Sequence, residues 1–531
     1  MQFLKKLFSR RPAAAATPPV SGSLQDAEIP GLHLLFPNNG YHWLNLAQTY
    51  YNRKDFDKAE AALQRIKDPG EELQAHISLL RSHRALMMEK LDLTRKLAEE
   101  ALELADLWQA HEILGHVFMR LHDFPEAVRH YEQASNLDPG NCIHSANLAL
   151  ALEETGRFAE SLAALERANA LNPRALTVLN SSLYLGAGLG ADELVSTALR
   201  NLERWFPLAH EPLLNRAFLH LAYGEYAQGF ADYEVRFKID FMGGHRKQKV
   251  INTGILAFPR WDGRPCPGKR LLLHCEQGAG DTLMMARFFK RLKQETQATL
   301  ICECQNELIG LLQDQLPIDE WIPLVVDRQD YATLKFDAWI PSMSLPWHFG
   351  ITLENLHSPQ RYLAAPADAA DYWRNYLASF PPGLRIGVAW SGNPTHAADR
   401  KRSIPFELFK PLLDTPNCHF FAVQLVKDKQ TLPENLIDLT DQLFTFGDTT
   451  AVLEAVDLVI TVDTSVVHLA GAIGKETWLL FPYRHEWRWG RTGEHSDWYP
   501  SVRIFRQAAP GDWTFPLSQV QQALLTQART R

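Results

Sequence analysis

The stretch DLVITVDTSVVHLAGAIG, residues 457–474, passes from a run of apolar residues directly into a helical pattern. The first part is typical of a buried strand, and the second part is typical of a helix that begins near Thr464. The polar residues at this junction are Asp463, Thr464, Ser465 and His468. Because the amides near Thr464 to Val466 have no partner inside the helix, they can donate hydrogen bonds to a phosphate, and the two hydroxyls add further donors.

The spacing of these residues disfavours two other roles. A Ser-His-Asp triad is disfavoured, because Ser465 and His468 lie three residues apart on one helix turn and no G-x-S-x-G elbow is present. A metal site is disfavoured, because a DxD element occurs only at Asp55-Phe56-Asp57, in a repeat turn. A structural role stays open, with Asp463 as a helix cap and His468 at the edge of the core.

Short apolar runs alternate with amphipathic helices around this stretch. The runs that predict strands are KRLLLHC (269–275), ATLICE (298–303), LRIGVAW (384–390), CHFFAVQL (418–425), DLVITV (457–462) and ETWLLF (476–481). Strand-helix-strand order at this spacing predicts parallel sheets with helices on their faces. A linker at Pro381-Pro382-Gly383 divides them into two doubly wound units, over 250–380 and 381–531, with a ligand cleft expected between their strand ends.

The first of these strands is followed by EQGAGDTLMMAR, residues 276–287. Gly278 and Gly280 let the backbone turn tightly and approach a ligand, and Asp281 then lies at the start of a helix. Two roles for Asp281 stay open: a helix cap, and a base that removes a proton from an acceptor hydroxyl. The stretch does not match the dinucleotide-binding fingerprint, because it lacks the third glycine of G-x-G-x-x-G.

The segment SGNPTHAADRKRSIP, residues 391–405, follows the first strand of the second unit. It carries Ser391, Gly392, Arg400, Lys401 and Arg402. A guanidinium fork matches a pair of diphosphate oxygens, although a basic loop can also be merely solvated. The position directly after a buried strand favours anion binding.

The first half of the chain contains a repeat with a period of 34 residues. The matching pairs are Leu114 and Leu148, Phe124 and Phe158, Ala134 and Ala168, and Pro139 and Pro173. This period resembles the tetratricopeptide repeat and predicts an α-helical solenoid over residues 36–240. Asn45, Asn147 and Asn215 fall at the same place in their repeats, where they either hydrogen-bond an extended peptide or only cap and solvate the helices.

Composition excludes several classes of protein. The chain has 531 residues and a formal net charge of −8, so no overall basic field favours nucleic acid. Six scattered cysteines without a CxxC pair are typical of a reducing compartment, and no run is long enough for a membrane span. We expect a cytoplasmic protein whose residues 1–35 form a disordered or weakly ordered tail.

The spaced motifs EQGAGDTLMMARF, DRKRSIP and VDTSVVHLAGAIGKETWLLFP together resemble the heptosyltransferase-like glycosyltransferases of family 9. The resemblance implies a GT-B fold, a nucleotide-sugar donor, inversion and no metal or other cofactor. It implies that Asp281 is the base and that Asp463, Thr464, Ser465 and His468 form the donor-phosphate turn. Arg402 falls near a cation that steadies the leaving diphosphate, where the family typically has lysine, so Lys401 is a second candidate.

The same resemblance extends to bacterial proteins that fuse tetratricopeptide repeats to such a domain. It implies a protein acceptor recruited by the solenoid, with flagellin or another surface protein as one possibility. Two alternatives remain. One is an adaptor without catalytic activity, and the other is a nucleotide-sugar epimerase, which would act with no acceptor present.

Overall fold

A computed structural model describes residues 40–207, 210–238, 253–325, 328, 330–356, 359–393, 399–424, 432–484 and 486–529. The chain divides into two compact units, Met1–Ser181 and Ser182–Arg531. The tail predicted over residues 1–35 lies outside the described residues, as do residues 394–398 of the basic segment.

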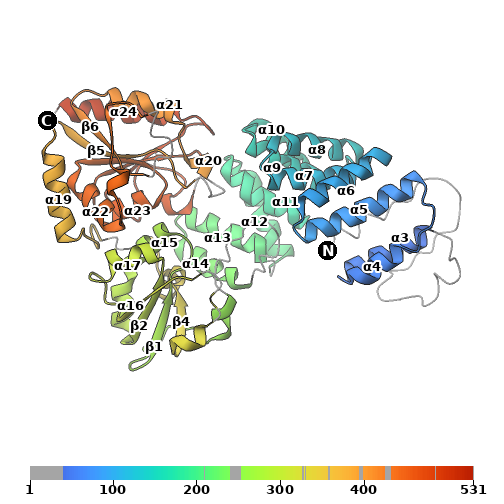
Figure 1. Ribbon diagram of the computed structural model, residues 1–531, viewed down its shortest axis with the longest axis horizontal. Coiled ribbons are helices and arrows are strands. Elements are labelled where there is room, and N and C mark those ends of the chain that lie inside the picture. The colour runs from blue at the N-terminus through green and yellow to red at the C-terminus, as the bar shows by residue number, and fades with distance from the viewer. Residues whose placement is uncertain are drawn as a thin grey trace. The chain divides into compact units, whose positions relative to one another are not determined.

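The first unit is a series of helix pairs (Figure 1). Its helices are α3 (Gly40–Asn52), α4 (Phe56–Leu63), α5 (Glu71–Met87), α6 (Leu91–Leu104), α7 (Trp108–Arg120), α8 (Phe124–Leu137), α9 (Cys142–Glu154), α10 (Phe158–Leu171) and α11 (Leu176–Ser181). Ala134 and Ala168, 34 residues apart, are fully buried, which lets helices pack closely. Asp123 caps α8 by accepting a hydrogen bond from the Glu126 amide at 3.4 Å.

The second unit begins with helices and continues with two sheets. Before the sheets come a π-helical turn (Ser182–Gly186), α12 (Asp192–Trp205), α13 (His210–Ala222), α14 (Tyr226–Tyr233) and a 3₁₀ turn (Glu234–Lys238). The first sheet contains β1 (Arg270–His274), β2 (Thr299–Cys304), β3 (Glu320–Pro323) and β4 (Ala338–Pro341). The second sheet contains β5 (Leu384–Ala389), β6 (Cys418–Ala422), β7 (Leu436–Asp438), β8 (Leu458–Val462), β9 (Thr477–Phe481) and β10 (Val502–Arg506).

All neighbouring strands in both sheets run parallel. The first sheet has the order β3-β2-β1-β4, and the second has the order β10-β9-β8-β5-β6-β7. In the first sheet, β2 and β4 lie on opposite sides of β1, so the strand order reverses at β1. In the second sheet, β6 and β8 lie on opposite sides of β5, so the order reverses there. Ligands of such sheets bind at the carboxyl ends of strands where the order reverses. The loops after β1, β5 and β8 all lie at these reversals.

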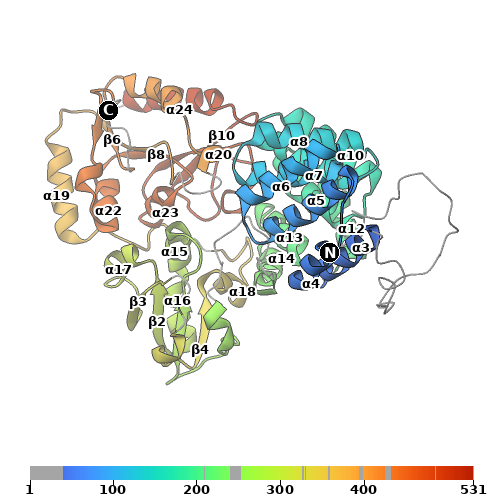
Figure 2. The same cartoon turned by 45° about the vertical axis from the view of Figure 1, so that its right-hand side comes forward.

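Helices cover the sheets on both faces. The helices of the first sheet are α15 (Ala279–Met285), α16 (Phe289–Thr296), α17 (Asn306–Leu312) and α18 (Leu345–His348). Those of the second are α19 (Ala367–Ala378), α20 (Asp399–Arg402), α21 (Phe406–Phe409), α22 (Phe446–Ala455), α23 (Ser465–Ala472) and α24 (Thr514–Arg529). Figure 2 shows α24 along one side of the second sheet and α22 and α23 on the other.

One apolar core joins the helix pair α13–α14 to both sheets. Trp498 is fully buried, and its ring lies 5.5 Å from Tyr226 and 6.2 Å from Phe230, both on α14, and 6.5 Å from Phe288 beside the first sheet. The last helix pair is therefore built into the second compact unit, which begins at residue 182, whereas the sequence predicted a boundary near residue 240. Shared burial of these aromatic rings is the physical reason for the difference.

The predicted fold class, a helical repeat solenoid followed by an α/β part of two parallel sheets, is confirmed. All six predicted strands are present, and β3, β4, β7 and β10 are additional. The helix expected over residues 280–294 is divided by a 3₁₀ turn at Ala286–Phe288 into α15 and α16.

Candidate active site

Asp281 lies in the first turn of α15, directly after the carboxyl end of β1. Its Oδ2 accepts a hydrogen bond from the Gly278 amide at 3.1 Å, so the carboxylate caps the start of the helix as one of the two predicted roles requires. Its Oδ1 accepts from Arg488, whose Nε lies at 3.0 Å and whose Nη2 also contacts it. The two side chains are 14% and 13% exposed, so the ion pair is largely shielded from water.

Arg488 is the centre of a cluster of polar groups. Its Nη1 donates to Glu486, its Nη2 donates to Gln277 Oε1 at 3.3 Å, and its backbone amide donates to Glu486 Oε2 at 2.9 Å. Burial opposes the charged form, but the carboxylates of Asp281 and Glu486 raise the pKa of Arg488 above its ordinary value. Arg488 therefore stays a cation. Burial raises the pKa of Glu486 to about 7, although Arg488 acts in the opposite direction.

The junction after β8 adopts the predicted strand-to-helix turn. Thr464 is the N-cap of α23, with extended backbone angles, and Ser465 is the first residue of the helix. Thr464 Oγ1 accepts a hydrogen bond from the Val466 amide at 3.3 Å. The expectation that the amides up to Val466 are open to a phosphate is therefore wrong for Val466, because the cap satisfies it. The cap residue is Thr464, and Asp463 accepts from Trp489 Nε1 at 2.9 Å instead.

At this turn His468 is buried and Asp463 is half-buried. Burial raises the pKa of Asp463, while the Trp489 hydrogen bond and the charges of Arg402 and Arg488 lower it. His468 is buried, its Nδ1 lies 3.1 Å from Tyr499 Oη, and its Nε2 lies 4.0 Å from Asp463 Oδ1. Burial lowers the pKa of His468 well below its usual range, and the nearby arginines act in the same direction. His468 is therefore neutral at physiological pH.

Gly280 allows the first turn of α15 to lie in contact with the first turn of α23. A Cβ atom placed on Gly280 would lie 2.6 Å from His468 Cδ2, closer than any real contact, so only glycine fits. Gly280 belongs to α15 and His468 to α23, and these two helices pack against each other. The loop that carries Asp281 and the turn at Asp463 therefore lie side by side.

The basic residues of the segment after β5 lie on a short helix. Asp399–Arg402 form the short helix α20, where the Arg402 Nε donates to Asp399 Oδ1 at 3.3 Å. Arg402 is 21% exposed, and its charge lowers the pKa values of both Asp463 and His468, which places it near the turn. Lys401 is half-buried on the same helix turn.

The backbone of Ser391 and Gly392 is engaged within the protein. The Ser391 amide donates to Gln424 Oε1 at 2.9 Å, and the Gly392 amide donates to Ser403 Oγ at 3.0 Å. A Cβ on Gly392 would lie 2.3 Å from Asp399 Oδ1, so this glycine permits a close approach of α20. Any contribution of Ser391 and Gly392 to donor binding would have to come from the Ser391 hydroxyl or from shape rather than from these amides.

The three asparagines predicted to bind a peptide differ in their surroundings. Asn45 is exposed on α3, as a peptide-binding side chain would be. Asn147 is buried, and its Nδ2 donates to Glu112 Oε1 at 3.2 Å. Asn215 is half-buried on α13, in the other compact unit.

Side chains from α14 and from the 3₁₀ turn Glu234–Lys238 bind the loop after β1. Arg236 Nε and Nη2 donate to the two carboxylate oxygens of Glu276 at 3.0 and 2.8 Å, and both side chains are almost fully buried. Gln277 Nε2 contacts Tyr233 Oη on α14. Sequence reasoning did not assign a role to these residues or to Glu486, Arg488 and Trp489. The run HEWRW, in which charged and aromatic residues alternate directly after β9, was the available signal.

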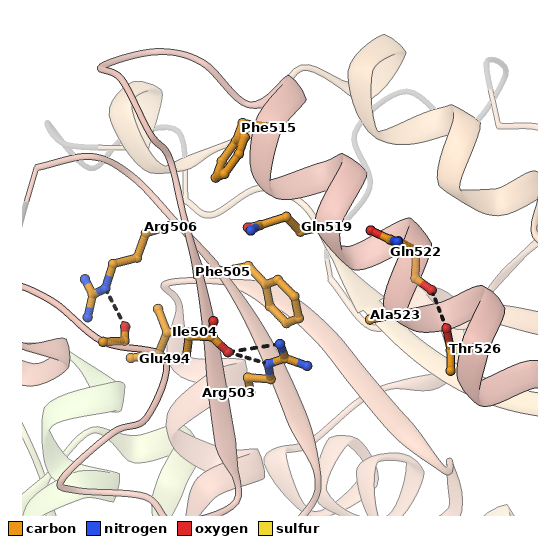
Figure 3. A pocket seen from close by; sticks show the side chains of 11 residues that line it. Glu494, Arg503, Ile504, Phe505, Arg506, Phe515, Gln519, Gln522, Ala523 and Thr526 are labelled. Atoms are coloured by element: carbon orange, nitrogen blue, oxygen red, sulfur yellow. Dashed lines mark hydrogen bonds and ion pairs between the residues drawn. The ribbon is translucent and has the colours of Figure 1, made fainter.

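A surface cavity of about 620 Å³ lies between β10 and α24 (Figure 3). Arg503 on its wall pairs with Glu494, with Nε at 3.0 Å and Nη2 at 2.9 Å from Oε2. None of the predicted site residues lines this cavity. Within the described ranges, no group of three or more His, Cys, Asp or Glu side chains is arranged to hold a metal, and no helix is long and apolar enough to cross a membrane.

Comparison with known proteins agrees with the two-part fold. The tetratricopeptide repeat family matches residues 43–67 and 114–175, which confirms the predicted repeats. The chain is 25% identical over 484 residues to protein FlbA of Caulobacter vibrioides (strain ATCC 19089 / CIP 103742 / CB 15), an alignment that spans 77% of each chain.

Among solved structures, the chain is similar to two glycosyltransferases. The glycosyl transferase family 9 protein from Veillonella parvula DSM 2008 is 13% identical, with a TM-score of 0.39, over 50% of this chain and 98% of that one. The ADP-heptose lps heptosyltransferase II of E. coli is 15% identical, with a TM-score of 0.34, over 49% of this chain and 99% of that one. The chain thus joins tetratricopeptide repeats to an α/β part with two parallel sheets.

Proposed function

We propose that the protein is a metal-independent, inverting glycosyltransferase that moves a sugar from a nucleotide-sugar donor to a hydroxyl of a protein acceptor. One observation carries the proposal. Arg488 binds Asp281 at the end of β1, while the next residue, Trp489, binds Asp463 at the end of β8. A candidate base and a candidate phosphate-binding turn are thereby held together at the strand reversals where ligands of parallel sheets bind.

The chemistry is a direct displacement. The acceptor oxygen attacks the anomeric carbon of the donor while the bond from that carbon to the phosphate oxygen breaks. Asp281 takes the proton of the acceptor hydroxyl, and the negative charge that develops on the leaving phosphate is met by the amides at the start of α23 and by Arg402. Attack from the face opposite the leaving group inverts the anomeric carbon.

The helical repeats support a protein as the acceptor. Stacked repeats present an extended surface that suits a peptide chain, and the exposed Asn45 can bond a peptide backbone. We place the enzyme in the cytoplasm, where nucleotide sugars are available as donors. Asn147, in the same unit as Asn45, stays a candidate although its amide is already bonded to Glu112. Asn215 stays a separate candidate in the second unit.

The proposal is tested by incubating the full chain with nucleotide sugars and candidate acceptor proteins and measuring the added mass. The Asp281→Asn variant keeps the shape of the side chain but cannot take the proton, so transfer should fall by about 10²–10⁴-fold. The exposed Asp262→Asn serves as the control and should transfer normally. Unchanged turnover in Asp281→Asn would refute the base assignment.

Two further results would decide between this function and its rivals. An adaptor would neither transfer nor hydrolyse any nucleotide sugar, whereas an epimerase would convert the donor with no acceptor present. Replacement of Arg402 by Met should weaken donor binding about 10- to 100-fold, since a charge-assisted hydrogen bond contributes about 1.5–3 kcal/mol. Normal donor affinity in Arg402→Met would leave this arginine a structural partner of Asp399.

A further inference from the structure

Arg488 occupies the place between the candidate base and the candidate phosphate turn. Its guanidinium contacts Asp281 on one side and Glu486 on the other, and its charge lowers the pKa values of Asp463 and His468 at the start of α23. It is held on a 3₁₀ turn, Trp487–Trp489, whose two tryptophans are buried on both sides of it. The backbone that carries the cation is therefore anchored, while its guanidinium lies between the two carboxylates.

Three carboxylates, Asp281, Asp463 and Glu486, lie within the field of this cation. Two other arginines act on the turn at His468: Arg402 is paired with Asp399, and Arg287 donates to the Trp498 carbonyl. A nucleoside diphosphate carries two or three negative charges. It can bind beside Asp463 only where a guanidinium is available to it, since like charges at this distance repel.

We propose that Arg488 is a catalytic residue that changes partners. Without donor it pairs with Asp281, and with donor bound it turns its donors to the leaving diphosphate and releases Asp281 to act as the base. This assignment rests on the proposed transferase function and deepens it.

Two features of the site make the exchange feasible. Both Nε and Nη2 of Arg488 donate to the same oxygen, Asp281 Oδ1, so one small rotation of the guanidinium frees two donors together. Asp281 keeps its second hydrogen bond, from the Gly278 amide to Oδ2, and so stays in position when Arg488 leaves. A planar guanidinium binds a diphosphate as well as it binds a carboxylate.

The exchange has a chemical consequence. A carboxylate paired with a guanidinium is a weak base, because the positive charge disfavours the uptake of a proton. When the diphosphate takes over the guanidinium, Asp281 becomes a stronger base at the moment when an acceptor hydroxyl can use it. The proton passes from that hydroxyl to Asp281, the new bond joins the acceptor oxygen to the anomeric carbon, and the electrons of the broken bond stay on the diphosphate beside Arg488.

The test compares four forms of the full chain: wild type, Asp281→Asn, Arg488→Met, and the two changes combined. The dissociation constants of uridine, guanosine, adenosine and thymidine diphosphate are measured by calorimetry, and the fold of each variant is checked by circular dichroism. Asp281→Asn frees Arg488 from a competing carboxylate, so it should bind the nucleoside diphosphate about tenfold more tightly, a gain of about 1.4 kcal/mol. The double variant should lose this gain and bind at least about tenfold more weakly than Asp281→Asn.

The double variant keeps the test sound if Arg488→Met alone fails to fold, because it leaves no unpaired carboxylate at position 281. Arg491→Met is the matched control: its guanidinium contacts Tyr223 and Asp192, and its nucleotide affinity should equal that of wild type. Equal affinities of Asp281→Asn and the double variant would overturn the role of Arg488 alone. Wild-type protein that binds none of the four nucleotides would overturn both proposals. The expected affinities without any sugar transfer would overturn the transferase function and the catalytic role of Arg488, and would leave only its change of partner on nucleotide binding.

Discussion

Arg236 donates to both carboxylate oxygens of Glu276, at 3.0 and 2.8 Å, and this ion pair lies almost fully buried between the last helix pair and the loop after β1. Arg236 Nη2 also donates to Ser344 Oγ at 2.7 Å, and Nη1 donates to the Tyr233 carbonyl at 3.1 Å. A guanidinium satisfied on all sides in this way fixes the direction in which the chain leaves β1. The position of Asp281, five residues after Glu276, depends on it.

Replacing Arg236 by Met should lower the free energy of unfolding by about 3–5 kcal/mol, because the change leaves the Glu276 carboxylate buried without a partner. Arg270→Met is the matched control, since its pair with Glu320 lies on the surface and should contribute at most about 1 kcal/mol. Chemical denaturation of both variants measures the difference. A loss for Arg236→Met as small as that for Arg270→Met would show that the buried pair does not hold the loop.

Replacing Gly280 by Ala should separate the first turns of α15 and α23. The new Cβ would lie 2.6 Å from His468 Cδ2, and overpacking of this kind costs about 1–3 kcal/mol. Gly310→Ala is the control: a Cβ at that position in α17 meets nothing within 4 Å, and alanine should stabilise the helix by about 0.5–1 kcal/mol. Thermal unfolding should thus move in opposite directions for the two variants, and a shift in the same direction would contradict the close contact.

Nucleotide binding should weaken as the pH rises through about 7. Burial raises the pKa of Glu486 to about 7, and Arg488, Asp463 and Asp281 are the charged groups that act on it. An anion that binds beside Glu486 favours the protonated form of this side chain, so binding is accompanied by uptake of a proton. Above about pH 7, where Glu486 is ionised before binding, nucleotide affinity should therefore be lower. Glu486→Gln, which cannot titrate, should flatten the dependence measured by calorimetry between pH 6 and 8. An unchanged slope in this variant would exclude Glu486 as its source.

The first compact unit should lose stability through Glu112 as the pH rises from about 4.5 to about 8. Burial, followed by the charge of Asp138, raises the pKa of Glu112 from its usual 4.5 to about 8. The pKa of Glu112 is higher in the folded state than in the unfolded state. The contribution of Glu112 to the free energy of unfolding is therefore fully present below about pH 4.5 and is lost as the pH rises to about 8. The groups facing Glu112 are Asn147, His116 and His144, at 3.2, 3.9 and 3.6 Å.

The measurement for Glu112 is the difference in melting temperature between wild type and Glu112→Gln from pH 5 to 9. Because glutamine keeps a hydrogen-bonding group but carries no charge, the variant should gain relative to wild type as the pH rises and level off above about 8. Glu132→Gln, an exposed change in α8, should show no such trend. A constant difference between wild type and Glu112→Gln would mean that the buried carboxyl titrates as it does in water.

The order of strands and helices was predictable from the sequence because it depends on local patterns. The β-branched run before Asp463 and the polar turn after it define strand and helix without reference to the rest of the chain. The 34-residue period identified the repeats for the same reason. By contrast, β3 and β7 are short and lack a long apolar run, so no local signal marked them.

The partners of the candidate site residues were not predictable in the same way. Asp281 and Arg488 are 207 residues apart, and nothing in either neighbourhood indicates that they meet. Asn147 occupies the expected repeat position, but whether its amide is open depends on Glu112, 35 residues away. Roles that depend on such distant contacts can be assigned only from the three-dimensional structure. The choice between helix cap and base for Asp281 is one of them.

The hydrogen bond between Tyr226 and Asp497, at 2.9 Å, joins residues 271 positions apart. During synthesis, the helix pair α13–α14 leaves the ribosome long before the segment that contains Asp497 and Trp498. The aromatic side chains of this helix pair can therefore be buried only after both sheets have been synthesised. We expect nascent chains that end before residue 497 to expose this apolar face and to depend on chaperones, whereas the repeats before residue 182 can fold as they emerge.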